Sequence, residues 1–400
     1  MIPNMDMETE RGTYPRVEAE IDLGAIRDNF AAMRGRLRDD TKMIAVVKTD
    51  AYGHGAVRIA EMMEPEAYIW GFAVATTEEA VELRRAGIRK PILCLGFVFP
   101  QDYDLLVRLQ IRPATFKLSM ARQLSEAASR AGMILPVHLA VDTGMGRIGF
   151  QVCEEDADEA AEIAKLSNLK VEGLFTHFAR ADERDKDYTQ EQFRKYCRFE
   201  QMLEERGVSI PLRHAANSAS IMELPGTHLD AVRAGITIYG IYPSDEVDRN
   251  LMPMKPAMSL ISHICYIKKV PAGTSISYGG TFVTERESRI ATIPVGYGDG
   301  YPRSLSNKGS VLIRGRRAPI VGRVCMDQFM VDVTEIEAEE FDRVTLLGQD
   351  GKDAVTTDEL GRLSGRFPYE LVCDISKRVP RVYVNAYSGC LDGDRFYCYI

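Results

Sequence analysis

One lysine stands between an apolar, β-branched run and a polar turn that contains two glycines. Lys48 follows Ile44 to Val47 and precedes Thr49 to Gly55, which reads TDAYGHG. An ammonium group at a hydrophobic wall loses solvation, and this loss favours the neutral amine. A neutral amine can form a Schiff base with a carbonyl compound or with pyridoxal phosphate. Most charged residues at strand ends are simply solvated, so the interpretation depends on the neighbouring motifs.

The segment from Ile44 to Gly55 resembles the cofactor-lysine segment of the alanine racemases, and further motifs of that family follow in the same order. They are VDTGMGR (141–147), FTHF (175–178), HAANS (214–218), VRAGI (232–236), SYG (277–279), VGYGDGY (295–301), GRVCMDQ (322–328) and RVPR (378–381). Each motif alone is a weak signal. Their common order extends the resemblance nearly to the C-terminus.

The resemblance implies a two-base racemase. The Cα proton of an amino acid is too weakly acidic to be removed in water, and pyridoxal phosphate provides a conjugated acceptor for the resulting charge. By resemblance, Lys48 holds this cofactor and acts as the base on one face of the substrate. Tyr278 acts as the second acid/base on the opposite face. The arrangement that the resemblance implies is a homodimer in which Tyr278 of one subunit faces the lysine of another.

The resemblance also implies roles for the other site residues. The family arginine that matches Arg233 sits at the pyridine nitrogen, which stays unprotonated because a guanidinium does not give up its proton. His214 is expected to hydrogen-bond Arg233, and His177 to hydrogen-bond Tyr278. The residues expected to hold the cofactor phosphate are Tyr52, Ser218, Tyr369, Gly235 and Ile236.

The surroundings of one arginine depart from the family pattern. Arg147 is expected to contact the phenolic oxygen of the cofactor, and Met326 the substrate carboxylate region. Many family members carry a lysine two residues before the DTGMGR string, carbamylated so that it orients the arginine, and this chain has Ala140 there. Alanine cannot hold a carbamate. We expect Arg147 to be buried and therefore to need another partner, for which a chloride ion or water is the simplest candidate.

Between about residue 40 and residue 240, short apolar runs alternate with helical segments. Eight such runs are present, at 43–47, 69–74, 92–95, 113–116, 137–141, 171–175, 211–214 and 229–233. Eight β/α units predict a TIM-type (β/α)8 barrel over residues 1–242. A doubly wound sheet is the competing fold, but the glycine-rich fingerprint expected after its first strand is absent. Short alternating strands predict a mostly-β domain over residues 243–400.

Five candidate residues occupy equivalent positions in this predicted barrel. Each lies at or just beyond the C-terminal end of a strand, the face on which barrel active sites are built. They are Lys48, Arg147, His177, His214 and Arg233. Singly, each could be an ordinary strand-end residue or ion-pair partner. Their collection on one rim is independent of the family resemblance and supports an active site there.

The composition argues against several other classes of protein. A formal charge of −8 without a basic cluster gives no sign of a nucleic-acid partner. No apolar run approaches the roughly 20 residues of a membrane span and the N-terminus is polar, so we expect a cytoplasmic protein. Eight cysteines without a CxxC motif indicate neither a disulfide framework nor a metal site. The tyrosine- and glycine-rich tail 386–400 matches no pattern that we can interpret.

These observations predict a homodimeric, pyridoxal-phosphate-dependent enzyme that interconverts L- and D-alanine and supplies D-alanine for cell-wall peptidoglycan. Tyr369 and Met326 would crowd a long side chain, which favours alanine. Racemisation of serine or of a broader range of amino acids is the alternative, because Ala140 leaves the substrate range open. A decarboxylase is disfavoured by the missing cysteine-aspartate motif. A non-catalytic pyridoxal-phosphate-binding protein would usually lack the β domain.

Overall fold

The computed structural model describes residues 14–385 and 396–398. The chain divides into two compact units, Arg27–Lys255 and a second unit that combines Met1–Ile26 with Pro256–Ile400. We call them the barrel unit and the β unit. This division differs from the expected boundaries, 1–242 and 243–400, because the N-terminal residues join the β unit and the barrel unit extends to Lys255. The tail 386–400, apart from residues 396–398, lies outside the described residues.

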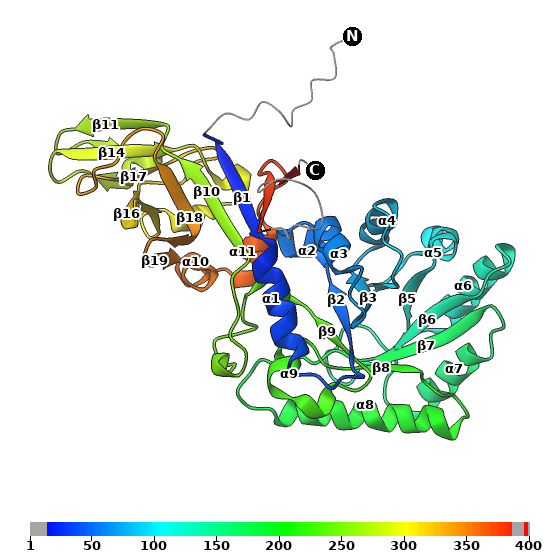
Figure 1. The fold of residues 1–400 in the computed structure, drawn as a ribbon. Coiled ribbons are helices and arrows are strands. Elements are labelled where there is room, and N and C mark those ends of the chain that lie inside the picture. The colour runs from blue at the N-terminus through cyan, green and yellow to red at the C-terminus, as the bar shows by residue number, and fades with distance from the viewer. Residues whose placement is uncertain (1–13, 386–395, 399–400) are drawn as a thin grey trace, which may run out of the picture. The chain divides into compact units, whose positions relative to one another are not determined.

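The barrel unit is built on eight parallel strands (Figure 1). They are β2 (Lys42–Val46), β3 (Ile69–Val74), β4 (Ile92–Cys94), β5 (Ile111–Thr115), β6 (Leu135–Ala140), β7 (Leu169–Phe175), β8 (Leu212–His214) and β9 (Ala231–Ala234). Strands β2 to β8 pair in sequence, and β9 pairs with β2. Hydrogen bonds from Asp230 N to Arg213 O (3.2 Å) and from Arg233 N to Ala216 O (2.9 Å) join β8 to β9 and nearly close the ring. The predicted barrel is confirmed.

Helices follow the strands and cover the outside of the barrel (Figure 1). They are α1 (Leu23–Arg34), α3 (Ala56–Met63), α4 (Thr77–Arg85), α5 (Tyr103–Leu109), α6 (Leu118–Arg130), α7 (Glu154–Ala164), α8 (Asp187–Glu205) and α9 (Ser218–Glu223). The division between the two units crosses α1. The segment labelled α2 (Lys48–Gly53) is not a regular helix, because four of its residues have a left-handed backbone. Helix α4 begins at a capping box, in which Thr76 Oγ1 accepts from Glu79 N (3.4 Å) and Glu79 Oε2 accepts from Thr76 N (3.3 Å).

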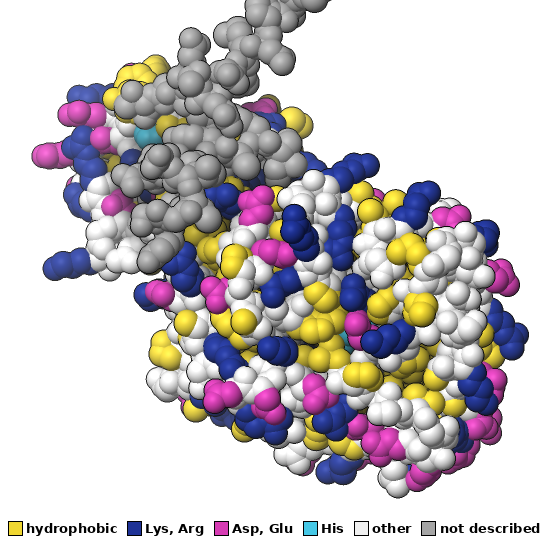
Figure 2. Space-filling model, turned by 45° about the vertical axis from the view of Figure 1, so that its right-hand side comes forward, with side chains coloured by type: hydrophobic (Ala, Val, Ile, Leu, Met, Phe, Trp, Pro, Cys, Tyr) yellow, Lys and Arg dark blue, Asp and Glu magenta, His cyan; other side chains and the backbone are white. Residues whose placement is uncertain are grey.

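Burial of alternating apolar side chains holds the barrel strands in register. Ile44 and Val46 on β2 pack with Ala73, Leu93 and Ala231 in one buried cluster. Trp70 and Tyr52 pack against its edge. One face of the barrel unit presents apolar side chains with lysines and arginines around them (Figure 2). The apolar β-branched runs recognised in the sequence are therefore the strands of the barrel wall.

The β unit contains a sheet of eleven strands in the order β11-β14-β17-β16-β15-β18-β10-β1-β20-β21, with β19 attached to β18. Its strands are β1 (Val17–Asp22), β10 (Met258–His263), β11 (Tyr266–Val270), β14 (Ser288–Ile293), β15 (Ser310–Ile313), β16 (Arg316–Val321), β17 (Phe329–Asp332), β18 (Arg343–Asp350), β19 (Asp353–Val355), β20 (Arg381–Val384) and β21 (Phe396–Cys398). A separate hairpin joins β12 (Ser275–Ile276) to β13 (Phe282–Val283), and the helices are α10 (Thr357–Ser364) and α11 (Pro368–Cys373).

The N-terminal strand β1 explains why the sequence-based boundary differs. It lies between β10, with which it pairs antiparallel, and β20, with which it pairs parallel. Ala19 and Ile21 are fully buried there. Arg16, just before β1, donates to both carboxylate oxygens of the buried Asp299 at 2.6 and 3.0 Å. The sequence of a strand does not show which other strands it pairs with. Because β1 precedes the barrel strands in the chain, the expected boundaries placed it with the barrel.

None of the helices in residues 14–385 combines the length and apolarity needed to cross a bilayer.

Candidate active site

Lys48 begins a turn whose backbone is left-handed over four consecutive residues. Thr49, Asp50, Ala51 and Tyr52 have φ of 51–55° and ψ of 42–50°. For L-residues this conformation costs roughly 1–2 kcal/mol each, and it concentrates at functional sites. Because none of the four is glycine, the surroundings must hold the turn in place.

Hydrogen bonds from several directions hold this left-handed turn. Ala51 N donates to Val47 O (2.8 Å), and Gly55 N donates to Asp50 O (2.9 Å). Thr49 N donates to Glu79 Oε1 (2.5 Å) at the start of α4. The turn brings the Tyr52 ring under the amine, with Lys48 Nζ 5.8 Å from the ring centroid. The predicted strand-to-turn junction at Lys48 is therefore present, but strained residues rather than glycines form it.

Three of the residues predicted to hold phosphate meet at one place. Gly235 N donates to Ser218 Oγ (3.0 Å), and Thr237 Oγ1 donates to the same oxygen (3.0 Å). A Cβ on Gly235 would lie 3.4 Å from Ser218 Oγ and 3.5 Å from Tyr52 Oη. The missing side chain of Gly235 thus leaves a small space bordered by a hydroxyl, a phenol and a backbone N–H. Ile236 is buried beside it at the start of a short 3-10 helix. These groups fit a phosphate, which binds through such donors.

Arg233 is a buried cation held by backbone carbonyls and imidazoles. Its Nη1 lies 3.0 Å from His214 Nδ1 and donates to His214 O at 2.8 Å. Its Nη2 donates to Thr176 O (2.6 Å) and to Ala215 O (3.0 Å). Burial lowers the pKa of Arg233 to about 10, so the guanidinium is charged at neutral pH. The contact expected between His214 and Arg233 is present.

His177 is surrounded by cations. Its Nδ1 lies 3.4 Å from Arg233 Nη2. Burial, followed by the positive charges of Arg233, Arg147 and Lys48, lowers the pKa of His177 to about 3. The imidazole is therefore neutral at neutral pH. Lys48, Arg147 and Arg233 thus all act on His177, at or just beyond the carboxyl ends of the barrel strands.

Arg147 differs from the expectation that it is buried. Its side chain is exposed, and within residues 14–385 no hydrogen bond or ion pair to it is present. The loop that carries it is nevertheless ordered by contacts of Asp142 Oδ1, which accepts from Gly144 N (2.9 Å) and Gly146 N (3.1 Å). Ala140 is buried at the end of β6. The expectation that the Arg147 guanidinium is buried is therefore wrong for a single copy of the chain.

The sequence did not single out three polar residues inside the barrel. His138 Nδ1 lies 2.9 Å from His214 Nε2, and His138 Nε2 lies 3.4 Å from Glu172 Oε2. Arg112 Nε donates to the same carboxylate oxygen (2.9 Å). The only sequence signal was a polar residue within or just before an apolar run, which alone does not indicate a role.

The β unit carries the predicted tyrosine on a tight hairpin loop. Between β12 and β13, Ser277 has a φ of 66° and its Oγ donates to Arg323 O (2.7 Å). Tyr278 follows with 70% of its surface exposed. A large exposed aromatic on an anchored loop is suited to contact another surface.

The β unit also carries Met326, on an exposed loop, and Tyr369, half-buried in α11. Gly298 N donates to Met326 O (2.8 Å), so the segment around Tyr297 is fixed to the Met326 loop. Tyr369, at the start of α11, lies with its ring centroid 4.3 Å from that of Phe367. Tyr278, Met326 and Tyr369 thus belong to the β unit, whereas the remaining predicted site residues belong to the barrel unit. The expected meeting of Lys48 and Tyr278 stays a prediction.

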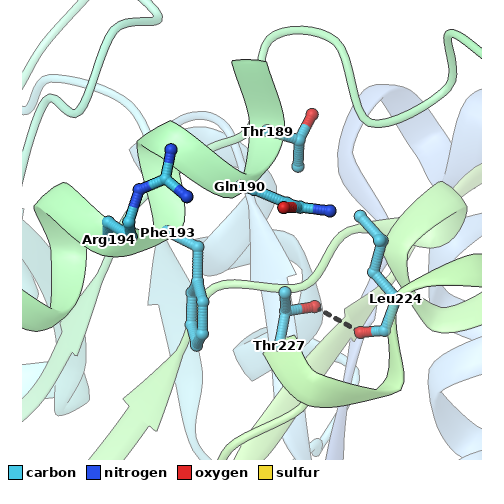
Figure 3. Close-up of a pocket in the computed structure, with 6 residues that line it drawn as sticks. All are labelled: Thr189, Gln190, Phe193, Arg194, Leu224 and Thr227. Atoms are coloured by element: carbon cyan, nitrogen blue, oxygen red, sulfur yellow. Dashed lines mark hydrogen bonds between the residues drawn. The ribbon is translucent and has the colours of Figure 1, made fainter. Parts of the chain in front are cut away.

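A separate hollow lies elsewhere on the barrel unit, between α8 and the segment after α9 (Figure 3). It is lined by Thr189, Gln190, Phe193, Arg194, Leu224 and Thr227. Thr227 Oγ1 donates to Leu224 O (2.8 Å) at its edge. None of the predicted site residues lines it. Among the described residues, no group of three or more His, Cys, Asp or Glu is arranged to hold a metal ion.

The neutral histidines of the barrel predict acid destabilisation. Burial lowers the pKa of His138, His177 and His214 below the ordinary 6.5. Below about pH 6.5 the unfolded chain binds protons at these residues and the folded chain does not, so stability falls as the pH falls. Each such histidine contributes a slope of up to roughly 1.4 kcal/mol per pH unit.

We expect the free energy of unfolding of the cofactor-free protein, measured with urea, to fall steadily from pH 7 to pH 5. His177→Asn should reduce the slope, because one histidine fewer takes up a proton on unfolding. A free energy that is constant or rises over this range would contradict the assignment of neutral histidines.

Comparison with known proteins places the chain in a family. The model of the alanine racemase N-terminal domain matches residues 21–243, and that of the alanine racemase C-terminal domain matches residues 257–383. Alanine racemase 1 of Clostridium acetobutylicum is 46% identical over 370 residues, which cover 92% of this chain and 95% of that protein. The alanine racemase of Desulforamulus reducens is 47% identical over 368 residues, covering 92% and 98%.

Solved structures agree with these matches. The alanine racemase of Clostridium difficile 630 is similar with a TM-score of 0.90 and 42% identity, over 94% of this chain and 97% of that one. The Bacillus anthracis alanine racemase with bound L-Ala-P gives a TM-score of 0.88 and 36% identity, over 94% and 96%. The similarity thus extends across both units and agrees with the motif order in the sequence: this chain belongs to the alanine racemase family.

Proposed function

We propose that this protein interconverts L- and D-alanine with pyridoxal phosphate bound at Lys48. The observation that carries the proposal is the group of cations at the carboxyl ends of the barrel strands. The three charged groups that act on His177 are all positive: Lys48, Arg147 and Arg233. Such a group is suited to anions, here a cofactor phosphate and a substrate carboxylate.

The residues fit the cofactor. Ser218 Oγ, Gly235 N and Tyr52 Oη border the small space described above and would hold its phosphate. Arg233 would face its pyridine nitrogen and, because it retains its proton, leave that nitrogen unprotonated. When bound, pyridoxal phosphate supplies the conjugated system that makes the Cα proton of an amino acid removable. Met326 and Tyr369 would narrow the space around the substrate side chain to that of alanine.

The protein groups would then move one proton on each face of the substrate. Lys48 Nζ takes or returns the Cα proton on one face, and Tyr278 Oη does so on the other. Tyr278 would come from a second copy of the chain, since its exposed loop is suited to reach another surface. His177, neutral and a hydrogen-bond partner in either tautomer, would orient the phenol. We further infer that the protein works in the cytoplasm as a homodimer and supplies D-alanine for cell-wall peptidoglycan.

The direct test is incubation of the purified protein with single L-amino acids, followed by chiral chromatography. L-Alanine should yield D-alanine fastest, with L-serine slower, because the substrate space is small. Equal rates across large and small side chains would favour the broad-specificity alternative. Absence of any D-isomer would contradict the proposed activity.

The attachment of the cofactor to Lys48 is tested chemically. Borohydride reduces a Schiff base to a stable amine, so peptide mapping after reduction should find the pyridoxyl group on Lys48. Lys48→Ala should lose both the label and the racemase activity. Lys42, at the other end of β2, is the control, since Lys42→Ala should keep both. A label on any other lysine would overturn the assignment.

The two-base arrangement predicts a selective loss on replacing the phenol. Tyr278→Phe should keep the cofactor absorbance but lower racemisation by about 10²- to 10⁴-fold, the usual contribution of a positioned acid or base. Tyr266→Phe serves as the control, since Tyr266 is also exposed in the β unit, at 52%. Wild-type rates in both directions for Tyr278→Phe would exclude this tyrosine as a base.

We also propose that a chloride ion partners Arg147 in the assembled enzyme. Ala140 cannot carry a carbamate, and Arg147 has no protein partner among the described residues. Activity should therefore not depend on bicarbonate, and replacing chloride with a large, weakly coordinating anion at constant ionic strength should lower it. Unchanged activity after this exchange would argue against chloride at Arg147.

A further inference from the structure

A line of hydrogen bonds crosses the interior of the barrel from Arg233 to the amino-terminal half of the strands. Arg233 Nη1 lies 3.0 Å from His214 Nδ1, and His214 Nε2 lies 2.9 Å from His138 Nδ1. His138 Nε2 lies 3.4 Å from Glu172 Oε2, to which Arg112 Nε donates at 2.9 Å. The line joins residues of β9, β8, β6, β7 and β5. It therefore connects the catalytic rim to the inside of the fold.

The chemistry at the two ends sets the direction of every hydrogen bond in this line. Arg233 can only donate, so His214 Nδ1 accepts and its proton is on Nε2. His214 Nε2 then donates to His138 Nδ1, and the proton of His138 is on Nε2 as well. Glu172, as a carboxylate, accepts that last proton. One donor end and one acceptor end thus allow a single tautomer for each imidazole.

The charges at the two ends are also complementary. Among the described residues, no carboxylate forms an ion pair with Arg233, whose direct partners are carbonyls and imidazoles. Both His138 and His214 are fully buried, and burial keeps the pKa of each below its ordinary value. Burial alone would raise the pKa of Glu172, but hydrogen bonds from His138 and Arg112 lower it to about 2. A buried cation is thereby linked to a stable carboxylate through two neutral rings.

The backbone leaves room for this line at Gly173. Gly173 on β7 is level with His138 on β6 in the parallel pairing. A Cβ there would lie 2.6 Å from His138 Nδ1 and 2.8 Å from its Cε1. Any side chain at this position would clash with the imidazole, whose Nδ1 faces His214, and the ring would have to move. The position of the His138 ring thus requires a glycine at 173, next to Glu172.

We propose that His138 and Glu172 are positioning residues, which hold His214 in the tautomer that accepts from Arg233 and so fix the guanidinium in the active site. The inference rests on the proposed function, in which Arg233 faces the pyridine ring of the cofactor. Without the carboxylate, only Arg233 still favours these tautomers, and His138 loses the acceptor that holds its proton on Nε2. His214 can then carry its proton on Nδ1, which places two donors face to face at Arg233 and displaces the guanidinium.

The first measurement needs neither cofactor nor substrate. Nitrogen-15 NMR of histidine-labelled, cofactor-free protein should show His138 and His214 neutral at pH 8, both with the proton on Nε2. Glu172→Gln keeps an acceptor oxygen and should keep both tautomers, whereas Glu172→Ala should give mixed tautomers. Glu200→Ala is the matched control, because Glu200 is 14% exposed against 19% for Glu172 and also accepts from an arginine, Arg213.

The second measurement tests the link to the active site. Glu172→Ala should weaken the binding of pyridoxal phosphate about three- to tenfold, the equilibrium effect of one hydrogen bond, and lower kcat more than it changes KM. Glu172→Gln should bind the cofactor like the wild type. Gly173→Ala, which displaces His138 without removing a polar group, should reproduce both the mixed tautomers and the weaker binding.

Each outcome decides the matter. A proton on Nδ1 of either histidine in the wild type would overturn the proposal, and this result does not depend on any variant folding. Mixed tautomers in Glu172→Ala with unchanged cofactor affinity and kcat would also overturn it. An equal loss of cofactor affinity in Glu200→Ala would do the same. If the tautomers are as expected but the wild type racemises no amino acid, the proposed function fails while the hydrogen-bond line stands.

Discussion

The site depends on keeping one positive charge, that of Arg233, inside the barrel without a carboxylate beside it. A buried cation is costly unless several acceptors surround it. The acceptors here are backbone carbonyls at the carboxyl ends of β7 and β8 together with His214 Nδ1. Strand ends supply such carbonyls because they have no further partner in the sheet. The barrel architecture thus supports the charge, and burial, followed by this charge, lowers the pKa of His177 and His214.

Lys48 is positioned by a strained turn rather than by buried charge. Four residues in left-handed backbone conformation follow β2, and their strain is offset by hydrogen bonds to Val47, just after β2, and to Glu79 of α4. The turn folds Tyr52 back beside Lys48, and Tyr52 also borders the space at Gly235. The amine of Lys48 and the phenol of Tyr52, which we propose for the cofactor phosphate, are therefore positioned by the same short segment. A regular helix after β2 would separate them.

The β unit has a fold of its own, and its N-terminal strand is part of it. β1 lies between β10 and β20, so residues from both chain ends form a single sheet. The Tyr278 loop is tied to its neighbour by the Ser277 hydroxyl, and the Met326 loop by a backbone hydrogen bond, although the Tyr278 and Met326 side chains are exposed. Such fixed, exposed side chains are preorganised for contact, which reduces the entropy lost when another surface binds them.

The sequence by itself determined the barrel and the family, because apolar runs, turn residues and ordered motifs are local signals. The roles of the barrel-side residues stay predictions. The sequence did not determine the left-handed turn at Thr49, since backbone strain is stabilised by contacts remote in sequence. It misplaced β1, because pairing partners of a strand are chosen by the tertiary fold. It also missed the line through His138 and Glu172. Polar residues in separate strands become one network only when the barrel closes and brings them within hydrogen-bond distance.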